Sequence, residues 1–136
     1  MKSIQNLKVN DILTNQELCD IFGCSPQGGM RRSHKTNTLI LISKTNNNIY
    51  EDRWLDDVFH YTGMGTTGDQ SLDFMQNKTL NESNRNDIEV HLFENPKRNV
   101  YVYLGQVFLS GEPYLENQTD ADDNSRNVYV FPLKLK

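Results

Sequence analysis

The densest group of residues that could recognise a ligand lies between positions 50 and 65. Tyr50 and Tyr61 stand near the ends of two short β-prone segments, and Asp52, Trp54 and Thr62 are close to them in the sequence. Two aromatic faces that flank a carboxylate and a hydroxyl could hold a planar base, because the rings stack on it and the carboxylate accepts from an exocyclic amine. The alternative, which composition alone favours, is that these aromatic residues belong to an ordinary β-sheet core.

A basic, glycine-bearing segment is the second candidate site. Residues 21–50 hold four Lys and Arg side chains and no acidic one, whereas residues 111–126 hold five acidic side chains against one arginine. Guanidinium groups, hydroxyls and exposed backbone N–H groups on a flexible loop could contact phosphate oxygens, although a solvated basic loop is the other interpretation. The candidate backbone contacts in this loop are Gln27, Arg31, Arg32, Ser33, His34 and Lys35.

The chain lacks the patterns that catalysis commonly requires. His34, His60 and His91 are scattered, and no nucleophile elbow, phosphate-binding loop or HExxH pattern occurs. Cys19 and Cys24 have no further ligands at the spacing of a tetrahedral zinc site. We therefore expect no catalytic residues, no metal and no cofactor in this chain.

Length and composition indicate one domain over residues 1–136. The net charge is −4, only 36% of the residues are hydrophobic and the mean hydropathy is −0.68, so we expect a small core and a very polar surface. No apolar run approaches the roughly 20 residues of a membrane helix, and the first ten residues lack the apolar stretch of a signal peptide. We expect a bacterial protein of the cytoplasm without a membrane partner.

One helix is predicted near the start, and mostly strands after it. Capping-box spacing at Thr14 and Glu17, an apolar stripe and Gly23 as a C-terminal cap predict a helix near residues 14–22. Gly105 indicates a bulge or bend, and Pro132 favours an edge strand or a bulge. Strands are predicted at 38–43, 49–54, 58–62, 88–94, 99–110 and 128–135, with a short helix near 79–83. These elements predict an α+β, mainly β fold, with a strongly curved sheet or small barrel over about 38–135.

Several motifs occur in an order that resembles one family. They are YED at 50–52, YTGMG at 61–65, GDQ at 68–70, NKTL at 77–80 and YVYLG at 101–105. In this order they resemble the SRA domain (SET- and RING-associated, also called YDG). The longer stretch from QGGMRRS to VFPL is similar to the N-terminal reader domain of bacterial modification-dependent HNH restriction endonucleases.

The resemblance implies a PUA-like curved barrel that flips 5-methylcytosine or 5-hydroxymethylcytosine out of duplex DNA. Tyr50 and Tyr61 would stack on the base, and Asp52 would accept from cytosine N4. Thr62 would contribute to the pocket wall, and Trp54, which has no obvious counterpart in the family, could be a stacking face itself. Three further residues would flank the other groove: Gln70, Asn77 and Lys78.

The resemblance also implies partners and leaves alternatives open. The expected partner is double-stranded DNA with modified cytosine, read for a type IV restriction system in phage defence. An HNH nuclease, either beyond Lys136 or as a separate protein, and a second copy of the chain are further candidate partners. The open alternatives are a reader of a phosphorothioate or glucosylated DNA, a PUA-like binder of RNA or single strands, and a small enzyme acting on nucleobases.

Overall fold

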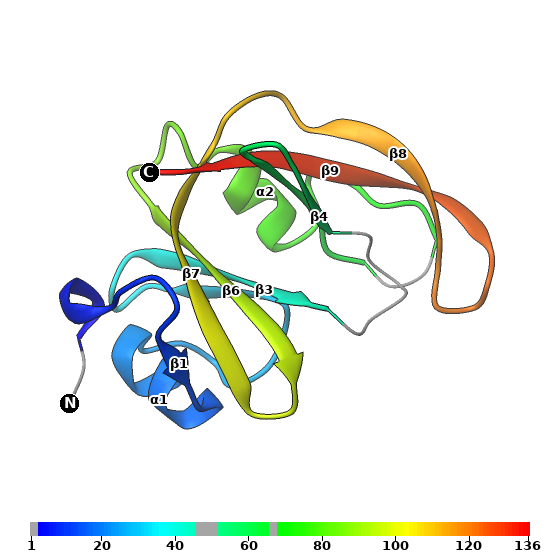
Figure 1. The fold of residues 1–136 in the computed structure, drawn as a ribbon. Coiled ribbons are helices and arrows are strands. Elements are labelled where there is room, and N and C mark those ends of the chain that lie inside the picture. The colour runs from blue at the N-terminus through cyan, green and yellow to red at the C-terminus, as the bar shows by residue number, and fades with distance from the viewer. Residues whose placement is uncertain (1–2, 46–51, 66–67) are drawn as a thin grey trace. The chain divides into compact units, whose positions relative to one another are not determined.

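The computed structural model describes residues 3–45, 52–65 and 68–136 (Figure 1). Nine strands and two α-helices lie in this part of the chain, which confirms the prediction of a mainly β fold with few helices. The chain divides into two compact units, which are described separately. Unit 1 comprises Met1–Asn46, Ile88–Val107 and Lys136, and unit 2 comprises Asn47–Asp87 and Phe108–Leu135. No described helix has the length and apolar character needed to cross a membrane.

The helix α1 (Asn15–Phe22) of unit 1 begins and ends as predicted. Thr14 caps it through a bond from the Glu17 N–H, and the Glu17 carboxylate accepts in return from the Thr14 N–H, so two otherwise unsatisfied donors are paired. Gly23 ends the helix in the left-handed region at φ 68°. The helix is preceded by a short 3-10 helix, Ile4–Asn6.

The strands of unit 1 form a mixed sheet. They are β1 (Ile12–Leu13), β2 (Met30–Ser33), β3 (Thr38–Lys44), β6 (Glu89–Lys97) and β7 (Val100–Leu109), whose last two residues belong to unit 2. β2 pairs antiparallel with β3, β3 pairs parallel with β6, and β6 and β7 form an antiparallel hairpin that β1 extends. Every β3 residue before Lys44 is buried, as its continuous apolar run predicts. Gly105, at φ 128°, lies at a register shift of the hairpin, which confirms the predicted bulge.

An apolar cluster holds α1 against this sheet. The Phe22 ring contacts Phe93 edge-on, with 5.8 Å between ring centroids, and lies 5.1 Å from the His91 ring. The buried members of the cluster are Leu13, Leu18, Phe22, Ile40, Ile42, Phe93, Tyr101 and Tyr103. Unit 1 is therefore stabilised mainly by burial of apolar side chains.

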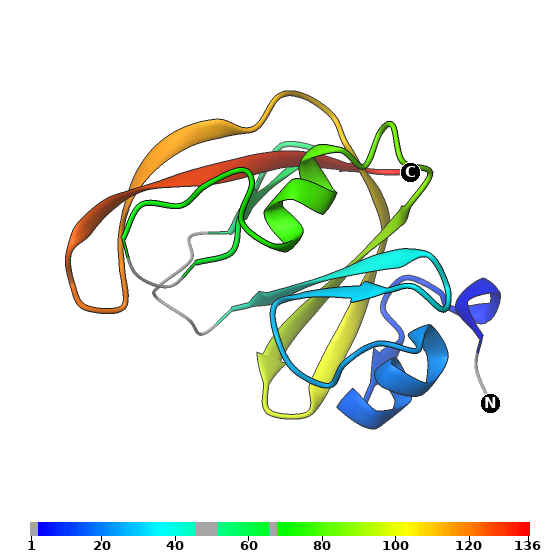
Figure 2. The ribbon, with the colours of Figure 1, turned by 180° about the vertical axis from the view of Figure 1, so that it is seen from behind.

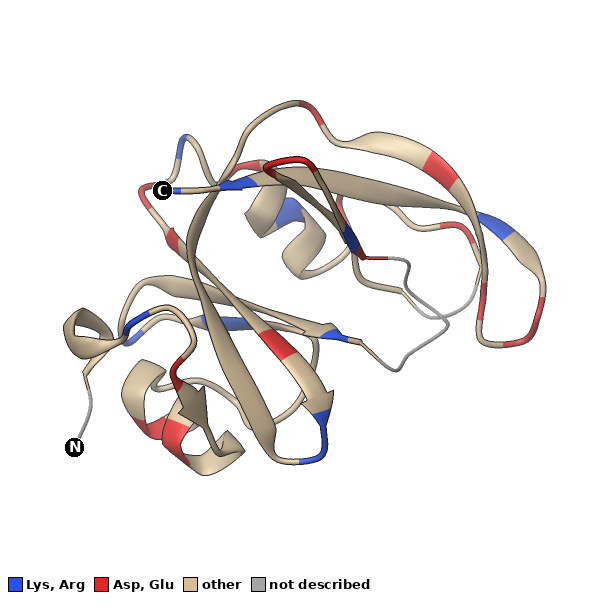
Figure 3. Ribbon diagram, in the orientation of Figure 1, with Lys and Arg blue, Asp and Glu red and all other residues tan. Residues whose placement is uncertain are grey.

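Unit 2 contains an all-antiparallel set of strands. They are β4 (Arg53–Leu55), β5 (Val58–Thr62), β8 (Tyr114–Thr119) and β9 (Ser125–Leu135), paired in the order β8, β9, β5, β4. The helix α2 (Gln76–Asn81) and the segment 68–75 that leads into it are seen most clearly from behind (Figure 2). Most residues coloured as acidic in this unit's β8–β9 hairpin lie on β8 and in the turn that follows it (Figure 3).

Pro132 does not lie on an edge strand, because β9 pairs with β5 on one side and with β8 on the other. The β8 pairing has already ended at Val130, and the Pro132 carbonyl points to that side, where it accepts from the Ser110 N–H. A residue's N–H points to the same side as its C=O, so the missing donor of Pro132 leaves the ladder to β5 intact. The prediction that Pro132 lies on an edge strand is wrong. The physical reason for that prediction still holds at Pro132 itself, because the ladder to β5 does not need an N–H from this residue.

Other sequence predictions require correction. Residues 30–33 of the expected flexible loop form the strand β2, and the second helix spans 76–81 rather than 79–83. Three strands were not predicted, β1, β2 and β8, because they are short or rich in polar residues. The predicted strand 49–54 lies partly outside the described residues, and its described end belongs to β4.

Candidate nucleic-acid interface

The hairpin formed by β4 and β5 brings Asp52 to Tyr61 and Thr62. Arg53 pairs with His60, so the next residues outward, Asp52 and Tyr61, lie on the same face of the hairpin. The Asp52 carboxylate accepts from the Thr62 backbone N–H at 2.7 Å. Three of the five predicted pocket residues are therefore together. Tyr50, the second predicted stacking residue, lies outside the described residues.

An aromatic row leads from the hairpin surface to its interior. The rings of Trp54 and Phe59 are 5.0 Å apart between centroids, and those of Phe59 and Tyr61 are 6.4 Å apart. Tyr61 is only 3% exposed, whereas Trp54 is 41% exposed. Trp54 thus presents an accessible aromatic face at one end of the row, and Tyr61 supplies a buried ring at the other.

Thr62 bonds to Asp52 through its backbone N–H and to Gln118 through its side-chain hydroxyl. Strand alternation turns the Thr62 hydroxyl to the opposite face from Tyr61, where it accepts from Gln118 Nε2 at 3.2 Å. The same Gln118 nitrogen donates to Glu116 at 2.7 Å. Arg53 binds both Glu116 oxygens, at 2.5 and 3.1 Å. This relay connects β4 and β8, the two outer strands of the unit 2 set.

The neighbouring groups of the relay lower the pKa of Glu116. Partial burial raises the pKa of Glu116, but hydrogen bonds from Arg53 and Gln118 and the Arg53 charge lower it more, so the pKa lies below its ordinary value. The neighbouring Tyr114 hydroxyl bonds to His60 Nδ1 at 2.6 Å, and burial together with Glu116 raises the pKa of Tyr114. Sequence reasoning missed Glu116 and Gln118, because they lie in the acidic segment 111–126, whose charge does not favour contact with DNA phosphates.

Asn77 stabilises the turn that follows Tyr61-Thr62. It is fully buried, its side-chain oxygen accepts from the Met64 N–H at 2.6 Å, and its nitrogen donates to the carbonyls of Met64 and Ser71. A Cβ on Gly63 would lie 2.6 Å from the Asn77 oxygen, so this close approach requires glycine there. Asn77, predicted to contact DNA, is an internal support of the turn.

Gln70 connects the same turn to β9. Its side-chain nitrogen donates to the carbonyls of Gly63 and Gly65, at 2.7 and 3.2 Å, and its side-chain oxygen accepts from the Tyr129 N–H. Buried Arg126 also donates to the Gly65 carbonyl. The turn is therefore held by amide and guanidinium groups from two different elements.

Asp120, in the turn between β8 and β9, supports the start of the segment 68–75. Its carboxylate accepts from the backbone N–H groups of Gly68, Asp122 and Asn124. These bonds, led by the one from Asn124, keep the pKa of Asp120 below its ordinary value. The acidic hairpin thus has a structural role in placing the glycine-rich segment.

The residues predicted to contact DNA divide into two groups by burial. Four are buried and bonded within the chain: Arg31, Ser33, Gln70 and Asn77. Four are exposed, Gln27, His34, Lys35 and Lys78, and Arg32 is half-buried. Only the second group and Arg32 offer side-chain surface to a large ligand.

Arg31 shows why burial excludes easy phosphate contact. Its guanidinium donates to the Gly28 carbonyl and to the Asn15 side chain, and it lies 5.5 Å from the Tyr101 ring centroid. Ser33 instead donates to the Phe22 carbonyl at the end of α1. Both residues stabilise the turn between α1 and β2 in unit 1.

Comparison with known proteins identifies the family and the fold. The model of the family described as "ScoMcrA-like, SRA domain" matches residues 10–135. The sulfur binding domain and SRA domain of ScoMcrA, complexed with phosphorothioated DNA, has 15% identity and a TM-score of 0.76, over 95% of this chain and 40% of that one. The chain also spans only 28% of the type IV phosphorothioation-dependent restriction endonuclease ScoMcrA. No curated protein matches the sequence.

Two further structures have the same fold. The DNA recognition domain of the cytosine modification-dependent restriction endonuclease LpnPI has 12% identity and a TM-score of 0.73, over 99% of this chain and 78% of that one. The SUVH5 SRA domain bound to fully hydroxymethylated CG DNA has 24% identity and a TM-score of 0.70, over 98% and 91%. The sequence motifs, the mainly β fold and a family match over nearly the whole length agree, and the chain belongs to the ScoMcrA-like SRA domain family.

Proposed function

We propose that this chain is the DNA-reading domain of a modification-dependent restriction endonuclease. It binds duplex DNA that carries 5-methylcytosine or 5-hydroxymethylcytosine and turns the modified base out of the stack. The observation that carries this proposal is the Asp52 carboxylate, held by the backbone N–H of Thr62, the residue that follows Tyr61 in β5. Nuclease activity resides in a separate HNH domain or protein, and the system acts in the cytoplasm.

Asp52 has the chemistry needed to recognise cytosine. An ionised carboxylate has two oxygens and about four acceptor positions, so a carboxylate that accepts from a backbone N–H can accept from an exocyclic amine as well. The Thr62 backbone nitrogen, 2.7 Å from Asp52 Oδ1, orients the carboxylate before the base arrives. Thymine, which carries a carbonyl oxygen in place of that amine, would face the carboxylate unfavourably.

The aromatic residues supply the stacking energy. Extrusion of a base costs a few kcal/mol, and stacking on an aromatic side chain returns about 1–3 kcal/mol per base. Tyr61 is the proposed inner stacking ring, with Tyr50 as its partner, and Trp54 is the exposed ring that guides the base inward. A small net gain implies modest affinity for the isolated domain.

Exposed basic residues make the proposed contacts to phosphate. In unit 1 these are Lys35 and the half-buried Arg32, together with the exposed polar side chains of Gln27 and His34, and in unit 2 Lys78. Buried Arg31 supports the segment before β2 and buried Asn77 supports the turn after Thr62, so neither is a proposed DNA contact. Phosphate contacts release counterions, so affinity should fall steeply as salt rises.

A titration of labelled duplexes tests the proposal. The duplexes are identical except for one cytosine, 5-methylcytosine, 5-hydroxymethylcytosine or one phosphorothioate linkage, and each is measured at two salt concentrations. A preference of at least about tenfold, equivalent to 1.4 kcal/mol, for a modified cytosine is expected, with loss of that preference in Tyr61→Ala and Asp52→Asn. Equal affinity for all duplexes, or undiminished preference in both variants, would refute it.

Phosphorothioated DNA is the second candidate ligand, because a ScoMcrA structure with this fold is complexed with such DNA. Preference for the phosphorothioate duplex that is unchanged by Asp52→Asn would favour this candidate. Sedimentation of the DNA complex would show whether one copy or two bind each duplex, which tests the proposed homodimer.

A further inference from the structure

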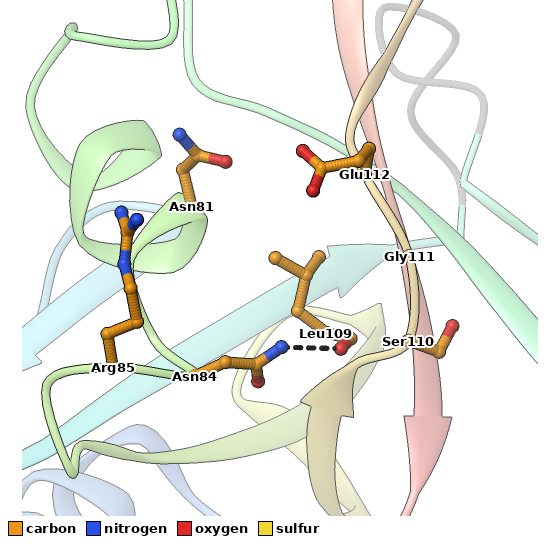
Figure 4. Close-up of a pocket in the computed structure, with 7 residues that line it drawn as sticks. All are labelled: Asn81, Asn84, Arg85, Leu109, Ser110, Gly111 and Glu112. Carbon is orange, nitrogen blue, oxygen red and sulfur yellow. Dashed lines mark hydrogen bonds between the residues drawn. The ribbon is translucent and has the colours of Figure 1, made fainter.

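A second pocket of unit 2 has the composition of a ligand site. It lies between the end of α2 and the segment after β7, with a volume of about 290 Å³ (Figure 4). One wall is formed by Asn81, Asn84 and Arg85, the other by residues 110–112, and Leu109 lies between them. Small-molecule sites measure about 300–1,000 Å³, so this pocket suits a single base or nucleoside rather than a peptide segment.

The charged groups of the pocket are available to a ligand, whereas Asn84 and Ser110 are bonded within the chain. Asn84 donates to the Leu109 carbonyl at 2.9 Å, which ties the two walls together. Among the described residues, Arg85 and Glu112 form no ion pair, so their opposite charges do not close the opening. Figure 4 shows the Asn81 amide and the Glu112 carboxylate facing each other across it, with Arg85 on the Asn81 side.

Arg85 on one wall and the Glu112 carboxylate on the other suit a ligand with acceptors on one edge and donors on the opposite edge. Guanine has the acceptors O6 and N7 side by side, which an arginine fork matches in a bidentate manner. Its N1–H and 2-amino group are adjacent donors, which suit the acceptor-only carboxylate of Glu112. Adenine and cytosine lack two adjacent donors on one edge. We infer that this pocket binds a guanine base.

The guanine site is independent of the proposed modified-base pocket. The two share no lining residue, although α2 contributes Asn77 to the turn near Tyr61 and Asn81 to the guanine site. The guanine could belong to an unpaired position of a nucleic acid or to a free nucleotide. Both sources present the same edges, so the experiment must separate them.

Amide chemical shifts of the isotope-labelled chain, titrated with GMP, IMP, AMP and CMP, test the inference. GMP should shift the signals of residues 81–85 and 109–112 and bind at least about tenfold more tightly than IMP, which lacks the 2-amino group. Glu112→Gln and Arg85→Ala should each weaken GMP binding about tenfold or more. The exposed Arg98→Ala and the β6 variant Glu94→Gln are matched controls and should leave it unchanged.

A short single-stranded oligonucleotide with one guanine, compared with one inosine, identifies the source. Tighter binding of the guanine oligonucleotide than of GMP indicates a nucleic-acid base, and equal binding indicates a free nucleotide. The inference is overturned if neither probe is preferred over its inosine form, or if the preference survives both substitutions. Tyr61→Ala, which should abolish modified-duplex recognition, should not affect GMP binding, so the two proposals can fail separately.

Discussion

The two units of this chain differ in the interactions that fix a central feature of each one. In unit 1, Phe22 and its apolar neighbours fix α1 on the sheet. In unit 2, the turn after Tyr61-Thr62 is held by polar side chains, chiefly Asn77 and Gln70. Apolar burial tolerates small shifts, whereas a hydrogen bond network is satisfied only in one geometry. Unit 2 has buried apolar residues as well, such as Phe131 and Leu133, so the contrast concerns its turn, whose polar bonds supply the fixed geometry that a base pocket needs.

Removing the central side chain of unit 1 should have the largest effect. Phe22→Ala deletes a fully buried ring that contacts Phe93 and His91, and such substitutions cost about 3–5 kcal/mol. We expect the midpoint of urea unfolding to fall accordingly. Below that midpoint, the preference among modified duplexes should persist, because no polar contact of the Tyr61 turn is changed.

The matched control is the conservative Phe22→Leu, which retains most of the apolar volume and should lose much less stability. If Phe22→Ala lowered stability by less than about 1 kcal/mol, the assignment of an apolar foundation to unit 1 would be wrong.

Asn77→Ala should have the next largest effect on stability. Unlike Phe22→Ala, it should also lower the preference for modified duplexes. It leaves the Met64 N–H and the carbonyls of Met64 and Ser71 without their partner in a buried place. An unsatisfied buried group costs about 1–3 kcal/mol, so we expect a loss of about 2–4 kcal/mol in urea unfolding. Duplex preference should fall as well, because the turn beside Tyr61 loses its support.

Asn127→Ala, at an exposed position of β9, is the control for Asn77→Ala. Asn77→Asp adds a sharper comparison, because it keeps the acceptor for Met64 N–H but places an oxygen against two carbonyls. Asn77→Asp should therefore be as damaging as Asn77→Ala. If both Asn77 variants kept the stability and the duplex preference of the parent chain, Asn77 would not be the residue that supports the turn.

The sequence predicted the elements whose signals are local. The capping box at Thr14, the left-handed Gly23 and the bulge at Gly105 each depend on a few neighbouring residues, and all three are confirmed. β2 and β8 were missed, because their polar residues face partners distant in the sequence. Arg31 in β2, for example, is buried against Tyr101 and Asn15.

The candidate site was predictable in its motifs but not in the roles of all their residues. Asp52, Tyr61 and Thr62 lie together, because they belong to one hairpin with a defined register. Gln70 and Asn77 looked like groove contacts, since polar residues near a glycine-rich turn are usually exposed. Their burial follows from long-range bonds to Gly63 and Met64, which no spacing rule reveals.

Stability of unit 1 should depend on pH through His91. Burial lowers the pKa of His91 below its ordinary 6.5, although Glu89 partly opposes this effect. The unfolded chain therefore takes up a proton more readily than the folded one, so stability should be complete above pH 6.5 and fall as the pH decreases below it. Chemical unfolding between pH 7.5 and pH 5 measures this slope.

His91→Gln removes the titrating group and should flatten that part of the pH profile relative to the parent chain. The exposed His34→Gln is the matched control for the loss of one imidazole. An identical slope in His91→Gln and the parent would show that other groups cause the pH dependence.

The smallest effect should come from the Arg53–Glu116 pair, the polar relay of unit 2 that lies nearest to solvent. Its side chains are 34% and 24% exposed, and exposed ion pairs usually contribute about 1 kcal/mol or less. Glu116→Gln should therefore change the free energy of unfolding by under about 1 kcal/mol, and less at high salt. Arg53 follows Asp52 directly, so the variant should lower the preference for modified duplexes more than it lowers stability. The exposed Lys134–Asp57 pair, tested as Asp57→Asn, is the control and should change neither. Equal effects of Glu116→Gln and Asp57→Asn on duplex preference would show that the relay does not contribute to recognition of the base.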